Sequence, residues 1–160
     1  NPGARTNIGK PTDKEFYHLP TYHEPNEAYD GSEQHGKYPL YHYCERTRWH
    51  MHTQFNYAPI LRELDPEPFL RMNPVDAESR GIADGDYVEA YNDRGHCVCK
   101  AKFDMGVRPG MVSSPKGWPR DLYVAGSYQE LTNDHLNTMH QNTSFDDTLV
   151  EVRKYEGEVK

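Results

Sequence analysis

The chain has 160 residues, enough for one domain with a single hydrophobic core, and a formal net charge of -7 at pH 7. This acidic balance argues against a protein that coats nucleic acid or an anionic membrane. The sequence contains no apolar run long enough to span a membrane and no apolar signal region at its start. Because it begins at Asn1 without a Met, we expect a processed protein or a segment of a longer one.

The first part of the chain is rich in Pro, Gly, Asn, Glu and Tyr and poor in aliphatic side chains. Such a composition cannot build a core of its own. We therefore expect residues 1–37 to form an extended lead-in arm, laid over the domain or over neighbouring protein. Residues 38–160 are expected to form the folded domain.

A basic and aromatic segment follows the first predicted strand, which covers residues 39–44. The segment consists of Arg46, Thr47, Arg48, Trp49, His50, Met51, His52, Thr53 and Gln54. Arginine offers a rigid fork of donors to phosphate, tryptophan offers a stacking surface, and threonine and glutamine offer orienting hydrogen bonds. A solvated loop with one half-buried Trp explains the same residues, so the segment alone leaves both interpretations open.

The middle of the chain alternates short helices and strands bounded by turn residues. We expect helices over residues 58–64 and 73–81, and strands over residues 69–72, 87–91 and 96–103. The second helix is the more clearly marked, because Asn73 suits its N-cap, Pro74 its first position and Gly81 a left-handed stop. The last two strands flank Asn92-Asp93-Arg94-Gly95, a hairpin turn.

The cysteines and histidines do not form a recognisable metal motif. The chain has three cysteines, and Cys97 and Cys99 lie on one face of a predicted strand. Structural zinc needs about four ligands, so we interpret these two thiols as core side chains. The nine histidines include one close pair, His50 and His52, at no spacing that matches a metal motif.

Two strands complete the predicted set, over residues 111–114 and 148–153. Between them, residues 115–144 are rich in Gly, Asn and His and show little periodicity. A loop of this length inside a compact domain is usually functional. Together the elements predict a small, mostly antiparallel β-barrel with one or two short helices.

Several short motifs occur in a distinctive order along the chain. After the basic segment come Asn73-Pro74-x-Asp76-Ala77, Gly81-Ile82-x-Asp84-Gly85-Asp86, Arg94-Gly95, Val107-Arg108-Pro109-Gly110 and a Trp-bearing loop. Over residues 38–154 this order resembles the C-terminal molybdopterin-dinucleotide-binding domain of the dimethyl sulfoxide reductase family of molybdenum and tungsten oxidoreductases. The resemblance implies a mostly β fold, a six-stranded double-psi β-barrel of the kind also seen in aspartate decarboxylase.

The resemblance also implies a cofactor, molybdopterin guanine dinucleotide, whose dithiolene holds molybdenum or tungsten. In the family the protein ligand of the metal lies in another domain, so we assign no catalytic residue, no metal ligand and no iron-sulfur cluster to this chain. The implied cofactor-binding residues are Arg46, Thr47, Arg48, Trp49, His50, His52, Thr53, Gln54, Asn73, Asp76, Lys116, Trp118, Gln129 and Asn137.

Some of these residues have competing structural roles, and some depart from the family pattern. Asn73 is explained as a helix N-cap without any ligand, and Trp118 as packing at the barrel bottom. Gln129-Glu130-Leu131-Thr132 resembles the family's Asn-x-Leu-Thr with Gln in place of Asn. Asn133 and Asn137 are the two candidates to take over that contact, and Asn137 is preferred. Asp146-Asp147 stands where the family has Lys or Arg, so one phosphate or pterin contact is expected to be missing.

These observations lead to one functional hypothesis and two alternatives. We expect the cofactor-binding C-terminal domain of a large oxidoreductase, inactive alone, whose partners are the other domains of the catalytic subunit, together with an iron-sulfur electron-transfer subunit. A separately encoded barrel subunit is the first alternative, and a decarboxylase-like enzyme self-cleaved at Gly126-Ser127 the second. No nucleic-acid or membrane contact is expected. The compartment, prokaryotic periplasm or cytoplasm, is left open because a targeting signal would lie upstream.

Overall fold

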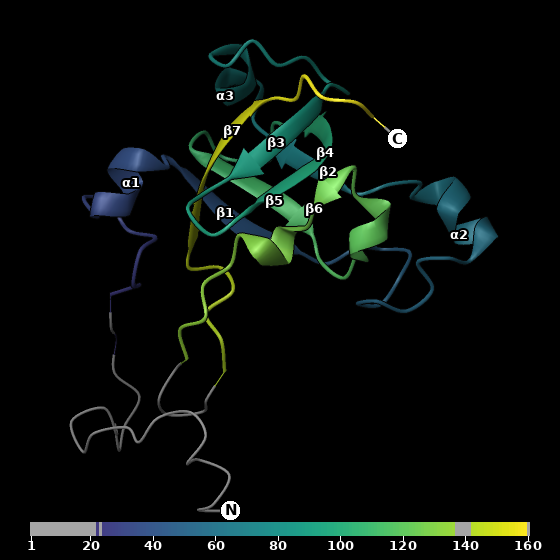
Figure 1. The fold of residues 1–160 in the computed structure, drawn as a ribbon, viewed down its shortest axis with the longest axis horizontal. Helices are drawn as coiled ribbons and strands as arrows, with labels where there is room; N and C mark the ends of the chain where they lie inside the picture. Colours follow the sequence, from purple (N-terminus) through teal and green to yellow (C-terminus); the bar gives the residue numbers. More distant parts are fainter. Residues whose placement is uncertain (1–21, 23, 137–141, 160) are drawn as a thin grey trace, which may run out of the picture.

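A computed structural model describes residues 22, 24–136 and 142–159. Six strands close into a barrel in the order β2-β5-β1-β7-β3-β4, with β4 returning to β2 (Figure 1). Their bounds are β1 Leu40–Glu45, β2 Phe69–Met72, β3 Tyr87–Tyr91, β4 His96–Phe103, β5 Met111–Pro115 and β7 Thr148–Lys154. The pairs β1–β5 and β2–β4 are parallel and the other four in the ring are antiparallel. The predicted six-stranded, mostly antiparallel barrel is confirmed.

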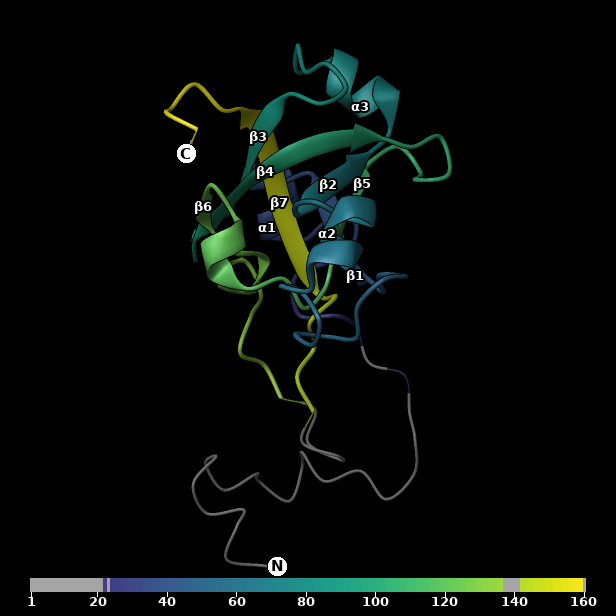
Figure 2. The same cartoon turned by 90° about the vertical axis from the view of Figure 1, so that its right-hand side faces the viewer.

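The strand directions place two loops at the same end of the barrel. Cys44 pairs with Ser114 and Glu45 with Pro115, so β1 and its parallel neighbour β5 finish side by side. The segments that follow them, residues 46–54 and 116–118, therefore meet at what we call the loop end. Because β2 is antiparallel to β5, α3 (Pro74–Glu78), which follows β2, lies at the opposite end. Figures 1 and 2 show α3 above the barrel, and Figure 2 shows the segment between β1 and α2 (Pro59–Leu64) below it.

The barrel interior is filled by aliphatic side chains from five strands. The side chains of Leu70, Met72, Val88, Val112 and Val150 are 0% exposed, and that of Leu40 on β1 is 2% exposed. Burying such a side chain stabilises the fold by about 1.5–3 kcal/mol, so this cluster supplies much of the drive for folding. Cys97 and Cys99 are also buried, which confirms their interpretation as core residues.

The helix at Asn73 forms as its sequence indicates. The Asn73 Oδ1 accepts a hydrogen bond from the amide of Val75 at 3.0 Å, and Gly81 adopts a φ of 65°. The regular helix ends at Glu78, three residues earlier than a helix running to Gly81, and turns lead from there to the glycine.

The long segment after β5 contains regular structure that its sequence did not indicate. It forms two short 3-10 helices, η3 (Arg120–Leu122) and η4 (Tyr128–Glu130), and a two-residue strand, β6 (Ala125–Gly126), that pairs with β4. The pairing needs a glycine, because Gly126 has a φ of 60° and a Cβ there would lie 2.0 Å from the carbonyl oxygen of His96. The expectation of an irregular loop was wrong for residues 120–130.

The end of the lead-in arm lies against the barrel. A short helix, α1 (Glu33–Lys37), which was not predicted, is capped by Ser32, whose Oγ accepts from the amide of His35 at 3.0 Å. The division into arm and barrel at residue 37 stays a prediction, because residues 1–21 and 23 lie outside the described residues. Within the described part of the chain, no helix is long and apolar enough to cross a membrane.

A buried histidine makes the stability of the barrel depend on pH. His42 on β1 is 0% exposed, and its Nε2 lies 2.9 Å from the Oγ of Ser114. Burial lowers the pKa of His42 to about 4, although the nearby Asp146 opposes the shift. In the unfolded chain a histidine pKa is roughly 6.5, so between these values only the unfolded state binds the proton.

We therefore expect the free energy of unfolding to fall as the pH is lowered from neutral towards 4, by roughly 3 kcal/mol from this residue. Urea denaturation of the chain and of His42→Gln at several pH values measures the effect. The variant keeps a hydrogen-bonding group for Ser114 but loses the titrating ring. Between about pH 6 and pH 4 its free energy of unfolding should therefore fall less steeply with pH, by the uptake of about one proton on unfolding. Equal slopes in both proteins would contradict this prediction.

Candidate functional site

Two adjoining cavities open at the loop end of the barrel. The smaller, about 130 Å³, is lined by Arg46, Thr47, His50, Met51, His52 and Lys116. The larger, about 310 Å³, is lined by Cys44, His52, Lys116, Tyr128, Gln129, Thr132 and Phe145. His52 and Lys116 border both cavities, so the two lie side by side, and together we call them the loop-end groove. Residues far apart in the sequence meet in it because β1 and β5 end together.

The basic loop rests directly on the turn after β5. Gly117 has a φ of 89°, and a Cβ on it would lie 2.2 Å from the carbonyl oxygen of His52. The buried Asn56 donates from Nδ2 to the carbonyl of Gly117 at 2.9 Å. This backbone-to-backbone approach admits no side chain at residue 117, and it fixes the height of the loop above the barrel.

The tip of the loop is a strained turn that presents His52 to the groove. The amide of Gln54 donates to the carbonyl of Met51 at 2.9 Å, and His52 adopts a φ of 52°. A non-glycine residue in this left-handed region costs of order 1 kcal/mol and persists where the surroundings impose it. Here the His52 backbone packs against Gly117, and the exposed His52 side chain borders both cavities.

His50 and Trp118 form the packing beneath the loop. The His50 ring lies edge-on to Trp118 with centroids 4.8 Å apart, and its Nδ1 is 3.2 Å from the carbonyl oxygen of His52. Its Nε2 lies 3.3 Å from the Oδ2 of Asp65, at ion-pair distance but not aligned as a hydrogen bond. Burial raises the pKa of the Asp65 carboxyl, although His50 opposes the shift. Trp118 is 3% exposed, so packing accounts for this side chain.

The groove is basic although the chain is acidic. The chain carries 25 Asp and Glu, yet none of the described residues that line either cavity is a carboxylate. Arg46 is exposed and Lys116 half-buried, so both can reach an anion in the groove. Thr132, Gln129 and His52 contribute further hydrogen-bonding groups. This donor set fits a ligand that combines phosphate groups with a polar ring.

Apart from Thr47, which lines the smaller cavity, the remaining residues of the basic loop lie on its outer side. Thr47 donates from Oγ1 to the carbonyl of His50 at 2.9 Å, so its hydroxyl is used within the loop. Trp49 is 39% exposed, with the guanidinium of Arg48 5.4 Å from its ring centroid. Thr53 and Gln54 are exposed and border neither cavity. The structure thus splits the loop into a groove side and a solvent side.

Asn73 and Asp76 are not brought to the groove. Asn73 is the N-cap of α3 and Asp76 lies in its first turn, at the opposite end of the barrel, where other parts of the chain bind both side chains. Asn73 caps the helix and donates from Nδ2 to the carbonyl of Val107 at 2.7 Å. The Oδ2 of Asp76 accepts from the amide of Gly110 at 2.8 Å. Their structural roles explain them. Asn137, the other expected contact, lies outside the described residues.

Five groove residues were not predicted as site residues: Cys44, Met51, Tyr128, Thr132 and Phe145. Thr132 belongs to the Gln-x-Leu-Thr motif, which was the one available signal for it. The Cys44 thiol is not set up as a nucleophile, because burial raises its pKa to about 12. Among the described residues, no group of three or more His, Cys, Asp and Glu could hold a metal ion.

Comparisons with known proteins agree with this geometry. Residues 40–149 match the family model described as the molydopterin dinucleotide binding domain. The chain is 38% identical over 118 residues to a putative dimethyl sulfoxide reductase catalytic subunit from Halobacterium salinarum, covering 74% of this chain and 14% of that protein. A dimethyl sulfoxide/trimethylamine N-oxide reductase of Rhodobacter capsulatus is 34% identical over 152 residues, covering 86% of this chain and 18% of that protein.

A solved structure shows the same fold. Acetylene hydratase from Pelobacter acetylenicus superposes with a TM-score of 0.75 and 21% sequence identity, covering 86% of this chain and 21% of that chain. The chain therefore spans about a fifth or less of the length of the proteins it resembles.

The contact beneath the basic loop generates a mutational prediction. Gly117→Ala should destabilise the protein by about 1–3 kcal/mol more than Gly110→Ala, because overpacking forces the backbone to shift. The two glycines have similar φ values, 89° and 84°, but nothing lies within 4 Å of a Cβ at residue 110. The control therefore carries the same conformational strain without the clash. Thermal denaturation of both variants, with limited proteolysis to find cuts in residues 46–56, measures the difference. Equal stability and equal cutting would show that the loop does not depend on this contact.

Proposed function

Because the chain belongs to the molydopterin dinucleotide binding domain family of dimethyl sulfoxide reductase-type enzymes, we propose that it is the C-terminal domain of a large molybdenum or tungsten oxidoreductase catalytic subunit. The domain binds molybdopterin guanine dinucleotide, as the sequence motifs predicted. The observation that carries the wider proposal is the match over residues 40–149 to proteins several times longer than this chain.

The loop-end groove is the proposed contact surface for the cofactor. None of its described lining residues is a carboxylate, which suits the charged pyrophosphate, and Arg46 and Lys116 are the proposed partners of that group. Gln129 and Thr132 are proposed to bond the polar edge of a ring in the larger cavity, with His52 between the two parts. When bound, the cofactor supplies the metal chemistry. The residues of this chain bind it and orient it.

An exposed apolar face beside the groove supports the proposal that more protein covers this side of the domain. Met51, Phe55, Ile60 and Leu64 are between 54% and 71% exposed, and no residue of α2 is buried. Four large apolar side chains exposed within residues 51–64 are typical of an interaction site. The other domains of the catalytic subunit are its proposed cover.

The names of the relatives bear on the partners. Matches include the alpha subunits of a respiratory nitrate reductase from Haloferax mediterranei and of a perchlorate reductase from Dechloromonas aromatica. Such names imply that those proteins work with further subunits, and an iron-sulfur electron-transfer subunit is proposed for this chain by analogy. Family membership gives no support to the decarboxylase-like alternative.

Loss of a groove cation should lower cofactor content. In the catalytic subunit that carries this chain, Lys116→Gln is expected to reduce bound metal and releasable guanine nucleotide by about tenfold under limiting cofactor, the effect of one charged hydrogen bond. Metal is measured by plasma mass spectrometry and nucleotide by chromatography after acid release.

The matched control is Lys102→Gln, an exposed lysine on β4 that borders neither cavity. It should leave cofactor content within twofold of the unsubstituted protein. Equal content in both variants would remove Lys116 from the site. An unsubstituted protein without any pterin nucleotide would contradict the proposed function itself.

A further inference from the structure

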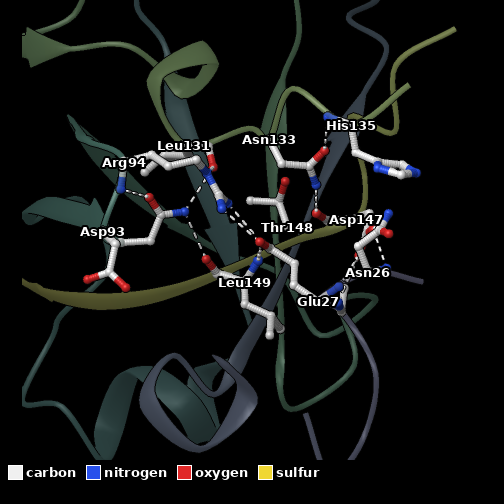
Figure 3. A network of polar contacts seen from close by, with 12 residues as sticks. Asn26, Glu27, Asp93, Arg94, Leu131, Asn133, His135, Asp147, Thr148 and Leu149 are labelled. Atoms are coloured by element: carbon white, nitrogen blue, oxygen red, sulfur yellow. Dashed lines mark hydrogen bonds and ion pairs between the residues drawn. The ribbon is translucent and has the colours of Figure 1, made fainter. Parts of the chain in front are cut away.

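Arg94 lies at the centre of a polar network that joins the lead-in arm to the barrel (Figure 3). Its guanidinium makes two parallel bonds to the Glu27 carboxylate, each 2.7 Å long. The Glu27 side chain is 12% exposed, and its Oε1 also accepts from the amide of Leu149 at 3.0 Å. A forked pair of this kind fixes direction as well as charge. Glu27 therefore determines how the Arg94 guanidinium points.

The other side of Arg94 holds the segment after η4. Its Nε donates to the carbonyl of Leu131 at 2.8 Å, and Asn92 Nδ2 donates to the same oxygen at 2.8 Å. Gly95 lets this segment approach, because a Cβ there would lie 2.8 Å from the Cβ of Glu130. Residues 130–131 thus pack against the hairpin turn, and Arg94 and Asn92 both donate to the carbonyl of Leu131.

Leu131 connects the hairpin turn to the loop-end groove. Gln129 and Thr132, on either side of residues 130–131, line the larger cavity, and Thr132 donates from Oγ1 to the carbonyl of Gln129 at 3.0 Å. The Leu131 side chain is 0% exposed, so the segment is anchored on both its backbone and its side chain. The hydrogen bonds to the Leu131 carbonyl therefore help to position the Gln129 and Thr132 side chains in the groove.

The arm is secured on Glu27's own side as well. Asp147 accepts hydrogen bonds from the amides of Asn26, Glu27 and Ala28 at 2.6, 3.1 and 2.8 Å. Burial favours a higher pKa for Asp147, but these amides outweigh it and lower the pKa below its ordinary value. The backbone carbonyl of Asp147 accepts from Asn133 Nδ2. Arm, hairpin, groove wall and the start of β7 are thereby joined by one set of contacts.

We propose that Glu27 and Arg94 are positioning residues: the docked arm aims the Arg94 guanidinium, which holds residues 129–132 as the wall of the cofactor groove. The inference rests on the proposed role of the groove. It makes arm docking and cofactor binding interdependent, and such coupling is reciprocal. The arm is thus part of the binding site although none of its described residues borders either cavity.

The first test needs no cofactor. The amides of Glu130 and Leu131 donate to the carbonyls of Ser127 and Tyr128, so their hydrogen exchange reports the order of the groove wall. Glu27→Gln should speed exchange at both amides at least fivefold. The matched control is Glu89→Gln, which breaks another arginine pair, to Arg153 at 2.6 Å, with a side chain that is 15% exposed. It should leave these two amides within twofold of the unsubstituted protein.

The second test concerns the cofactor. In the catalytic subunit, Glu27→Gln and Arg94→Lys should each lower cofactor occupancy about fivefold or more, because lysine keeps the charge but lacks the fork. Adding Thr132→Ala to Glu27→Gln should cost less than the product of the two separate losses, since both act through the same wall. A merely structural role for Glu27 would give independent, multiplying losses.

The outcomes separate the two claims. Unchanged exchange at Glu130 and Leu131 in Glu27→Gln, or an equal change in Glu89→Gln, overturns the positioning role. Multiplying losses in the double variant overturn it too. If Glu27→Gln does not fold, Arg94→Lys is read in the same exchange assay with the same criteria. A different pair of results would contradict the proposed function alone. In that case Glu27→Gln speeds exchange at Glu130 and Leu131, which supports the positioning role, but the unsubstituted protein contains no pterin nucleotide.

Discussion

The parallel pairing of β1 with β5 is the constraint on which the candidate site depends. It aligns Cys44 with Ser114 and Glu45 with Pro115, so the chain leaves both strands at the same end of the barrel. Residues 46–54 and 116–118 then have to share that end, although more than sixty positions separate them in the sequence. The antiparallel run of β2 sends α3 to the other end. Strand direction alone thus separates Lys116 from Asp76.

Close backbone contacts turn this shared end into a groove. A Cβ on Gly117 would clash with the carbonyl oxygen of His52, and one on Gly126 with the carbonyl oxygen of His96. A Cβ on Gly95 would clash with the Cβ of Glu130. At each place a side chain would force the segments apart. The described residues that line the resulting hollow include Arg46 and Lys116 and no carboxylate, in a chain with an acidic balance. Such a lining suits an anionic dinucleotide.

Features encoded by neighbouring residues were predictable from the sequence. The alternation of apolar and polar residues predicted β3 and β4, and Asn73 and Pro74 predicted the start of α3. Helix caps and strand faces depend on the spacing of neighbouring residues. The order of motifs indicated the family, whose resemblance implied the cofactor. The basic loop was predicted to contribute to the binding site, and part of it lines the groove. Strand β6 was missed because its pairing depends on a distant glycine contact. The same limit applies to Asp147, which was noted only as a departure from a basic residue. Its carboxylate binds amides about 120 positions away, and nothing in the local sequence indicates that.

The central claim is that the pyrophosphate of the cofactor lies in the loop-end groove. A crystal structure of the cofactor-loaded catalytic subunit tests it most directly. The structure is expected to place phosphate oxygens within hydrogen-bonding distance of the Lys116 Nζ and the Arg46 guanidinium, with the polar ring of the ligand beside Gln129. Density for the dinucleotide at the other end of the barrel, against Asn73 and Asp76, would contradict it.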